Sequence, residues 1–330
     1  MTLKFHSAGD FLEYVRFVYS RPMSSIEGAA NMEFLRIHQE RAKDEPIPPD
    51  PHEHIVELLW QAVNAALPPK HRESLGNAIA VGSLDQITVN ALCIRSPEGF
   101  VAIVVNRGLL TFLNKISKLQ VASAAEGSVL YCNRGPAQDI TPAIASQWFL
   151  ETCEHYRDTG KPLGPQIHLT PDATLRHNQQ LHLWEIFVVA HELGHVISGH
   201  LEEGDTCRPS PTFGMLETYM ENESHIQEVE ADVVAYRLLR RHAQSMEGVK
   251  QELIDQQLLA AVTLLFDLLF LIGAGDSKSH PNPLDRLCNI VAEVYGEDVA
   301  ERLAKTYETR GLVKSFFSES FIARRSPDWD

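Results

Sequence analysis

The sequence predicts a mostly helical α+β protein with a small antiparallel sheet. From residue 142 onward, apolar residues recur at helical spacing almost to the C-terminus. Between residues 85 and 105 the pattern is that of two strands, separated by a turn-forming stretch at 96–99. The length of 330 residues and the apolar share of 44% are enough for a complete hydrophobic core.

Two regions are expected along the chain. Residues 1–75 are predicted to be an N-terminal helical extension, with helices at 10–19 and 54–67. A proline-rich linker at 46–51 separates the two helices, because proline interrupts a continuous helix. Residues 76–330 are predicted to form the main domain.

The main domain is expected to begin with a β-hairpin and to continue with helices. Residues 85–95 alternate between apolar and polar positions, residues 100–105 are uniformly apolar, and residues 129–132 suggest a further short strand. Residues 204–214 are a loop by composition, and the tail from residue 318 is expected to fray. Helices are predicted at 109–119, 142–158, 173–201, 222–246, 249–273, 283–295 and 298–310.

One of these helices contains an apolar run, residues 258–275, that is long enough to raise the question of a membrane span. Asp267 lies in the middle of the run, where a charge costs roughly 2.5–3.5 kcal/mol on insertion scales. A buried core helix is therefore predicted.

The net charge and the cysteines indicate which kind of partner and which cellular compartment to expect. A net charge of −15 repels phosphate backbones, which argues against nucleic acid as a partner. The five cysteines are odd in number and widely spaced, which argues against a disulfide scaffold and indicates a reducing compartment. The N-terminus lacks the apolar stretch of a secretory signal, so a cytoplasmic location is expected.

A metal-binding motif lies in the predicted helix at 173–201. His191, Glu192 and His195 form H-E-x-x-H, and residues four apart lie on one helix face, so both imidazoles can bind one tetrahedral Zn²⁺. Glu192 can act as general base, taking a proton from water and passing it to the leaving amine. The flanks are apolar nearly all round, and burying these three side chains without a partner would cost several kcal/mol. A metal ion supplies that partner.

A catalytic zinc site needs a third protein ligand, and the residues just downstream do not provide it. At the positions where a metzincin has its glycine and third histidine, this chain has Ser198 and Leu201. His200 follows His195 by five residues and is predicted to be a helix-end or supporting residue.

Better candidates lie on the next predicted helix. Glu228 and Asp232 share one face, so one carboxylate can bind zinc while the other orients a ligand imidazole. Ala231 is small enough to let two helices approach closely, and Glu230 is expected to face solvent. Two further residues are alternative ligands: Glu221 and His225.

Three segments resemble the gluzincin peptidases of the HtpX and CAAX prenyl protease family. Besides H-E-x-x-H, residues 228–232 match E-x-x-A-D and residues 279–286 match S-H-P-x-x-x-x-R. The resemblance implies a zincin-like metallopeptidase fold, with Glu228 as third zinc ligand and Asp232 supporting a ligand. It also implies that His280 donates a hydrogen bond to the substrate oxyanion, and Arg286 is expected to pair with a nearby carboxylate.

The chain departs from that family in two respects. Eighty residues separate His191 from Leu110, where a Gly-Leu-Leu turn resembles the family's own, and the family's membrane helices are missing. Membrane substrates are therefore not expected. The chain also resembles, more loosely, the phage-exclusion protease Lit, a soluble H-E-x-x-H enzyme directed at a cytosolic protein.

The leading prediction is a soluble zinc-dependent endopeptidase that acts on a specific intracellular protein, as a host-defence or regulatory protease. Its expected partner is a protein or peptide substrate, with neither nucleic acid nor stable membrane insertion. Residues 100–105 are predicted to be the edge strand to which an extended substrate adds.

Two other functions are open. One is a zinc-stabilised protein-binding module without catalysis, and the other is a metal-dependent hydrolase of non-peptide bonds. Glu192 argues against the first, because a purely structural site has no use for a base beside its ligand. Cys207, in the loop after the metal-binding helix, is a free cysteine, a fourth ligand of a structural site, or a thiolate that caps the zinc and keeps an enzyme latent.

Overall fold

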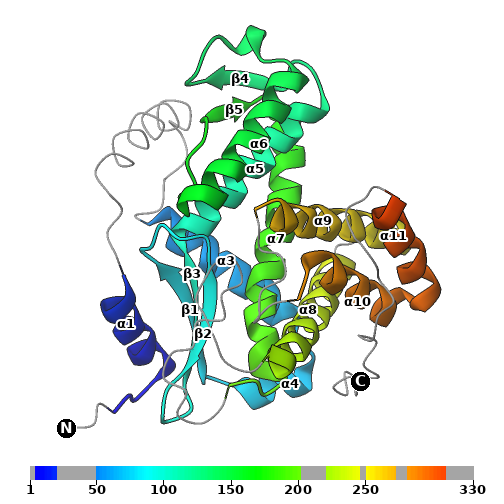
Figure 1. Ribbon diagram of the computed structural model, residues 1–330. Coiled ribbons are helices and arrows are strands. Elements are labelled where there is room, and N and C mark those ends of the chain that lie inside the picture. The colour runs from blue at the N-terminus through cyan, green and yellow to red at the C-terminus, as the bar shows by residue number, and fades with distance from the viewer. Residues whose placement is uncertain (1–3, 21–49, 202–220, 246–249, 273–280, 310–330) are drawn as a thin grey trace.

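The protein is α+β and mostly helical, as predicted (Figure 1). A computed structural model describes residues 4–20, 50–201, 221–245, 250–272 and 281–309. The helices are α1 (Ala8–Tyr19), α3 (Pro51–Ala66), α4 (Pro69–Leu75), α5 (Arg107–Ala124), α6 (Pro142–Thr159), α7 (Pro171–Ile197), α8 (Glu221–Gln244), α9 (Gln251–Leu271), α10 (Pro283–Tyr295) and α11 (Glu297–Thr309). The strands are β1 (Ile79–Leu84), β2 (Ala91–Arg95), β3 (Val101–Asn106), β4 (Val129–Cys132) and β5 (Ile167–Leu169).

The predicted hairpin is present and belongs to a three-stranded sheet of order β1-β3-β2. β2 pairs antiparallel with β3, with Ala91 opposite Val105. β1, which was not predicted, pairs parallel with β3, with Ile79 opposite Val101. The sheet is therefore mixed rather than purely antiparallel.

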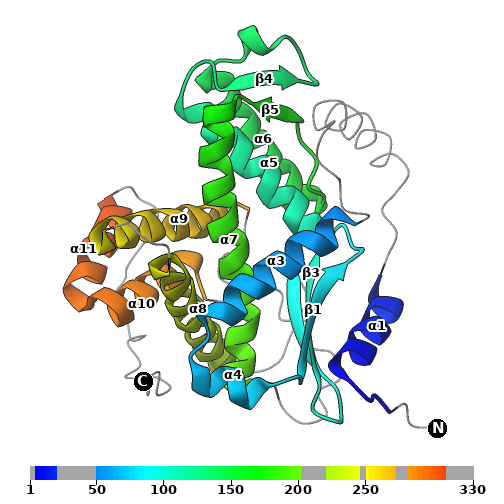
Figure 2. The same ribbon diagram turned by 180° about the vertical axis from the view of Figure 1, so that it is seen from behind.

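β3 is the central strand of the sheet, and both faces of the sheet are covered (Figures 1 and 2). On one face, α1 packs against alternate residues of the strands through Phe11 and Val15. The other face belongs to the main core, which α3 and α7 share. The prediction that residues 100–105 form an edge strand for substrate is wrong, because every residue of β3 is buried between its two neighbours. An uninterrupted apolar run is typical of a strand buried on both faces.

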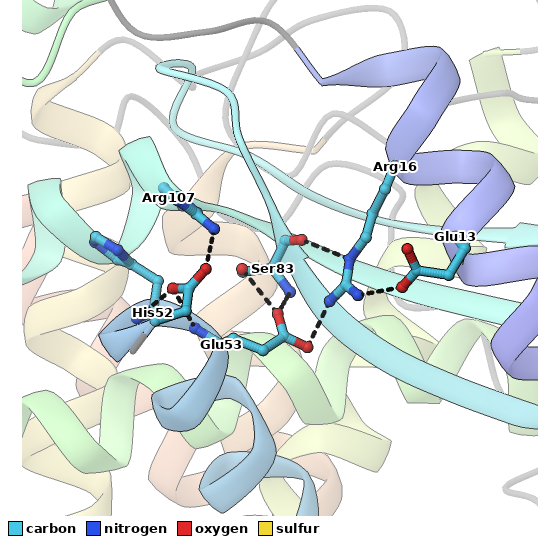
Figure 3. A network of polar contacts seen from close by, with 7 residues as sticks. Glu13, Arg16, His52, Glu53, Ser83 and Arg107 are labelled. Atoms are coloured by element: carbon cyan, nitrogen blue, oxygen red, sulfur yellow. Dashed lines mark hydrogen bonds and ion pairs between the residues drawn. The ribbon is translucent and has the colours of Figure 1, made fainter. Parts of the chain in front are cut away.

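A polar network joins α1 and α3 to the sheet and to the start of α5 (Figure 3). Arg16 on α1 pairs with Glu53 on α3, and Glu53 accepts hydrogen bonds from Ser83 N (2.8 Å) and Ser83 Oγ (2.9 Å) on β1. Arg107, the first residue of α5, pairs with Asp50, the N-cap of α3. These contacts connect the predicted N-terminal extension with the main domain, and the boundary after residue 75 stays a prediction.

α7 runs through the centre of the molecule, and α3, α5, α8 and α9 pack against it (Figures 1 and 2). At one end, α5 lies beside the N-terminal half of α7 and α6 packs on α5, near the point where β4 pairs antiparallel with β5. The buried residues of these helices and of the inner sheet face form one large core.

Among the described helices, α9 alone is long and apolar enough to cross a membrane. In this fold it packs against α7, α8 and α10. Trp184 Nε1 on α7 donates a hydrogen bond to the Ala261 carbonyl on α9 (2.7 Å), and Phe187 stacks edge-on against Phe266. α9 thus contributes to the core, as predicted.

The predicted helices are all present, with ends within five residues of the expected bounds. α7 was expected to reach residue 201 but ends at Ile197. Gly199 takes a positive φ of 75°, a conformation that favours glycine and terminates a helix. The predicted loop at 204–214 and the tail from residue 318 lie outside the described residues.

Candidate metal centre

Three potential ligands come together from two helices. His191 and His195 lie one turn apart on α7, and Glu228 lies on α8, which packs along it. The two Nε2 atoms are 3.2 Å apart, and the Glu228 oxygens are 3.6 Å from His191 Nε2 and 3.4 Å from His195 Nε2. All three side chains are buried, and no other described residues form such a group.

These separations fit a bound metal ion. In a tetrahedral site with ligand bonds of about 2.0–2.1 Å, neighbouring donor atoms lie roughly 3.3 Å apart. The three separations here are 3.2, 3.4 and 3.6 Å. Two imidazole nitrogens and one carboxylate oxygen are also donors that zinc accepts. The group can therefore hold a metal ion.

The ligands meet because α7 and α8 approach unusually closely at Gly194 and Ala231. A Cβ atom added to Gly194 would lie 2.7 Å from the Ala231 carbonyl oxygen and 2.8 Å from its Cα atom. Only glycine fits at this point of α7, and the small Ala231 on α8 was expected to allow such an approach. The spacing that holds the three ligands together is thus built into the helix contact.

Two buried charged residues support His191. Asp232 Oδ1 lies 2.9 Å from His191 Nδ1, the ring nitrogen turned away from the other ligands. Arg286 on α10 binds both carboxylate oxygens of Asp232 at 2.7 Å and lies 3.3 Å from Glu228 Oε2. Burial would raise the pKa of Asp232, but the charge and hydrogen bonds of Arg286, followed by His191, hold it below its ordinary value. Asp232 is therefore an ionised acceptor beside a potential ligand.

A second chain of contacts leads away from His195. Its Nδ1 atom is 2.9 Å from Nδ1 of His200, and His200 Nε2 is 2.9 Å from Glu230 Oε2. His200 is brought back toward His195 because α7 ends before Gly199. The expectation that Glu230 faces only solvent is wrong, since its carboxylate meets a buried imidazole. Burial, and then the charge of His195, lower the pKa of His200 to about 4.

Glu192 is completely buried between α7 and the sheet. Its carboxylate accepts a hydrogen bond from the thiol of Cys93 on β2, and α7 packs directly against that strand. Burial and the negative charge of Glu192 raise the pKa of Cys93 well above its ordinary value, so the thiol keeps its hydrogen. Sequence reasoning missed this contact.

Several predicted site residues remain outside this geometry. His280 and Cys207 lie outside the described residues, as does the side chain of Glu221. His225 does not belong to the three-residue group. Among the described cysteines none forms a disulfide: Cys93, Cys132, Cys153 and Cys288.

Comparison with known proteins adds one match. Residues 185–305 match the family model described as Peptidase U49, a peptidase family related to Lit. No curated protein and no solved structure matches the chain. The matched segment contains the three potential ligands, Asp232 and Arg286. The match supports protease activity and the looser of the two resemblances, to Lit, while the relationship to HtpX and the CAAX proteases stays a prediction.

Proposed function

We propose that this chain is a zinc-dependent endopeptidase that cleaves a specific intracellular protein. The observation that carries the proposal is the buried His191, His195 and Glu228 group, whose donor atoms are spaced as a tetrahedral ion requires. The peptidase family match over the same helices supports peptide bonds as the target.

Zinc is the proposed ion because of the donors. Imidazole nitrogen suits zinc well, whereas magnesium and calcium prefer sites made of oxygen. Two histidines and one glutamate are also a known ligand set of catalytic zinc, with a fourth position left for water or substrate. A bound zinc ion would polarise the scissile carbonyl and make water a stronger nucleophile.

The chain itself supplies the proton transfer. Glu192 follows the ligand His191 directly and is wholly buried, so its carboxylate can accept the proton of the attacking water and deliver it to the leaving amine. The thiol of Cys93 contributes a weak hydrogen bond to that carboxylate. Such a base contributes about 10²–10⁴-fold to the rate.

His280 is proposed as the donor to the substrate oxyanion, where one hydrogen bond contributes about 10²–10³-fold to turnover. Cys207 is proposed either as a free thiol or as a reversible cap on the zinc. The proposed location is the cytoplasm.

The competing function, a zinc-stabilised binding module, makes a different prediction for Glu192. Replacing it by glutamine keeps the shape but removes the proton acceptor, so a protease loses its activity and a binding module loses nothing. The experiment is N-terminal labelling of the proteome in cells that express wild-type protein or Glu192→Gln. We expect new N-termini only with the wild type, and equal zinc content in both purified proteins. Cleavage that persists in Glu192→Gln would refute the mechanism, and no cleavage in either would favour the binding module.

A further inference from the structure

We infer that His200 and Glu230 form a hydrogen-bonded relay that fixes His195 in the one ring tautomer and orientation that can bind a metal through Nε2. The inference rests on the proposed metal site. It assigns a role to Glu230, whose side chain is 28% exposed, and to His200, which is 6% exposed.

The position of His195 Nε2 determines where the ring hydrogen lies. Nε2 faces His191 and Glu228, so it is the atom that would bind the ion. A neutral imidazole that binds a metal through Nε2 carries its hydrogen on Nδ1. His195 Nδ1 is 2.9 Å from His200 Nδ1, so His195 donates this hydrogen bond and His200 must accept it.

Glu230 in turn determines which tautomer His200 adopts. If His200 accepts at Nδ1, its own ring hydrogen is on Nε2. That atom lies 2.9 Å from Glu230 Oε2, and an ionised carboxylate only accepts hydrogen bonds. Glu230 therefore favours the tautomer of His200 that can accept from His195. The other tautomer would set two N–H groups against each other across 2.9 Å.

The relay depends on how α7 ends. His200 N donates to the His195 carbonyl (2.9 Å), a backbone turn that the positive φ of Gly199 allows. This turn brings the His200 ring beside His195, while α8 supplies Glu230 two residues after Glu228. The Nδ1 atom of each histidine in the group thus faces another polar group: Asp232 Oδ1 at 2.9 Å for His191, and His200, backed by Glu230, for His195.

The test is the zinc affinity of the full-length protein, stripped of metal and titrated in competition with a chromophoric chelator. Residues that support a metal ligand typically change its affinity by about 10–100-fold. We expect losses of that order in Glu230→Ala and His200→Leu. His200→Gln should keep most of the affinity, because its amide oxygen can accept from His195 and its amide N–H can donate to Glu230. The matched controls are Glu252→Ala and His54→Leu, at exposed positions on α9 and α3.

A second measurement determines the tautomer of His200 and does not depend on catalytic activity. In ¹⁵N–¹H correlation spectra of the zinc-loaded protein, His200 should carry its hydrogen on Nε2, and Glu230→Ala should populate the other form. Wild-type zinc affinity in Glu230→Ala, or equal losses in His200→Gln and His200→Leu, would overturn the relay and leave the zinc site standing. A wild-type protein that binds no zinc would overturn both.

Discussion

Replacing Gly194 by alanine tests how closely α7 and α8 must approach for the metal ligands to meet. The new Cβ atom would lie 2.7 Å from the Ala231 carbonyl oxygen and 2.8 Å from Ala231 Cα. These are backbone atoms, which cannot rotate out of the way. Because non-bonded carbon atoms prefer about 3.5–4.0 Å, the helices would have to separate by roughly 1 Å.

Two opposing effects decide the result of this substitution. Alanine is more favourable than glycine inside a helix by about 1 kcal/mol, which alone would stabilise α7. Overpacking costs about 1–3 kcal/mol, and a displacement of roughly 1 Å is well beyond the tolerance of about 0.2 Å for ligand distances. Glu228 moves with α8 while both histidines move with α7. We therefore expect a loss of up to about 2 kcal/mol in folding stability and a 10–100-fold loss of zinc affinity, as for other distortions of ligand support.

Chemical unfolding of the metal-free protein measures the first effect, and chelator competition measures the second. Gly135→Ala is the matched control, because a Cβ atom there meets nothing within 4 Å and its φ is not positive. A Gly194→Ala variant with wild-type stability and wild-type zinc affinity would show that the two helices are not held this close.

Two further substitutions test the site and the core. Glu228→Ala should lose most of the zinc, because two imidazoles alone hold it poorly, and full zinc content by elemental analysis would move the third ligand elsewhere. Burial raises the pKa of Glu185 on α7 to about 8. A buried carboxyl with a raised pKa loses stability as pH rises from its unfolded value, about 4.5, to 8, by roughly 1.4 kcal/mol per unit. Glu185→Gln should therefore be several kcal/mol more stable than the wild type at pH 8 and nearly equal near pH 5, and a difference that does not change with pH in denaturant titrations would contradict this.

The helices were predictable because their signals are local. Asp50, Thr141 and Asn282 each precede a proline at the first helical turn, and each side chain accepts a backbone hydrogen bond there. β1 was missed because it contains Gly82, and glycine is depleted in strands. A Cβ atom at Gly82 would clash with the guanidinium of Arg16 on α1, a contact that no local pattern reveals.

The site shows the same difference between local signals and contacts that no local signal reveals. His191 and His195 are related by the helix period, so their shared face could be predicted from spacing alone. Cys93 could not, because its contact with Glu192 joins a strand and a helix far apart in the chain, and Glu230 could not, because its partner His200 lies beyond the end of α7. His200 depended on where α7 stops, and a helix end is the least certain feature of a periodic pattern.

The coordination sphere of the metal is the most direct test of the proposed zinc peptidase. X-ray absorption at the zinc edge of the purified full-length protein reports the donor atoms and their distances. We expect about one zinc per chain, with nitrogen and oxygen donors at about 2.0–2.1 Å and the scattering pattern of two imidazoles. A sulfur donor at about 2.3 Å would place a cysteine on the metal, as a closed structural site or a thiolate-capped zinc requires, and a protein that purifies and reconstitutes without zinc would contradict the account.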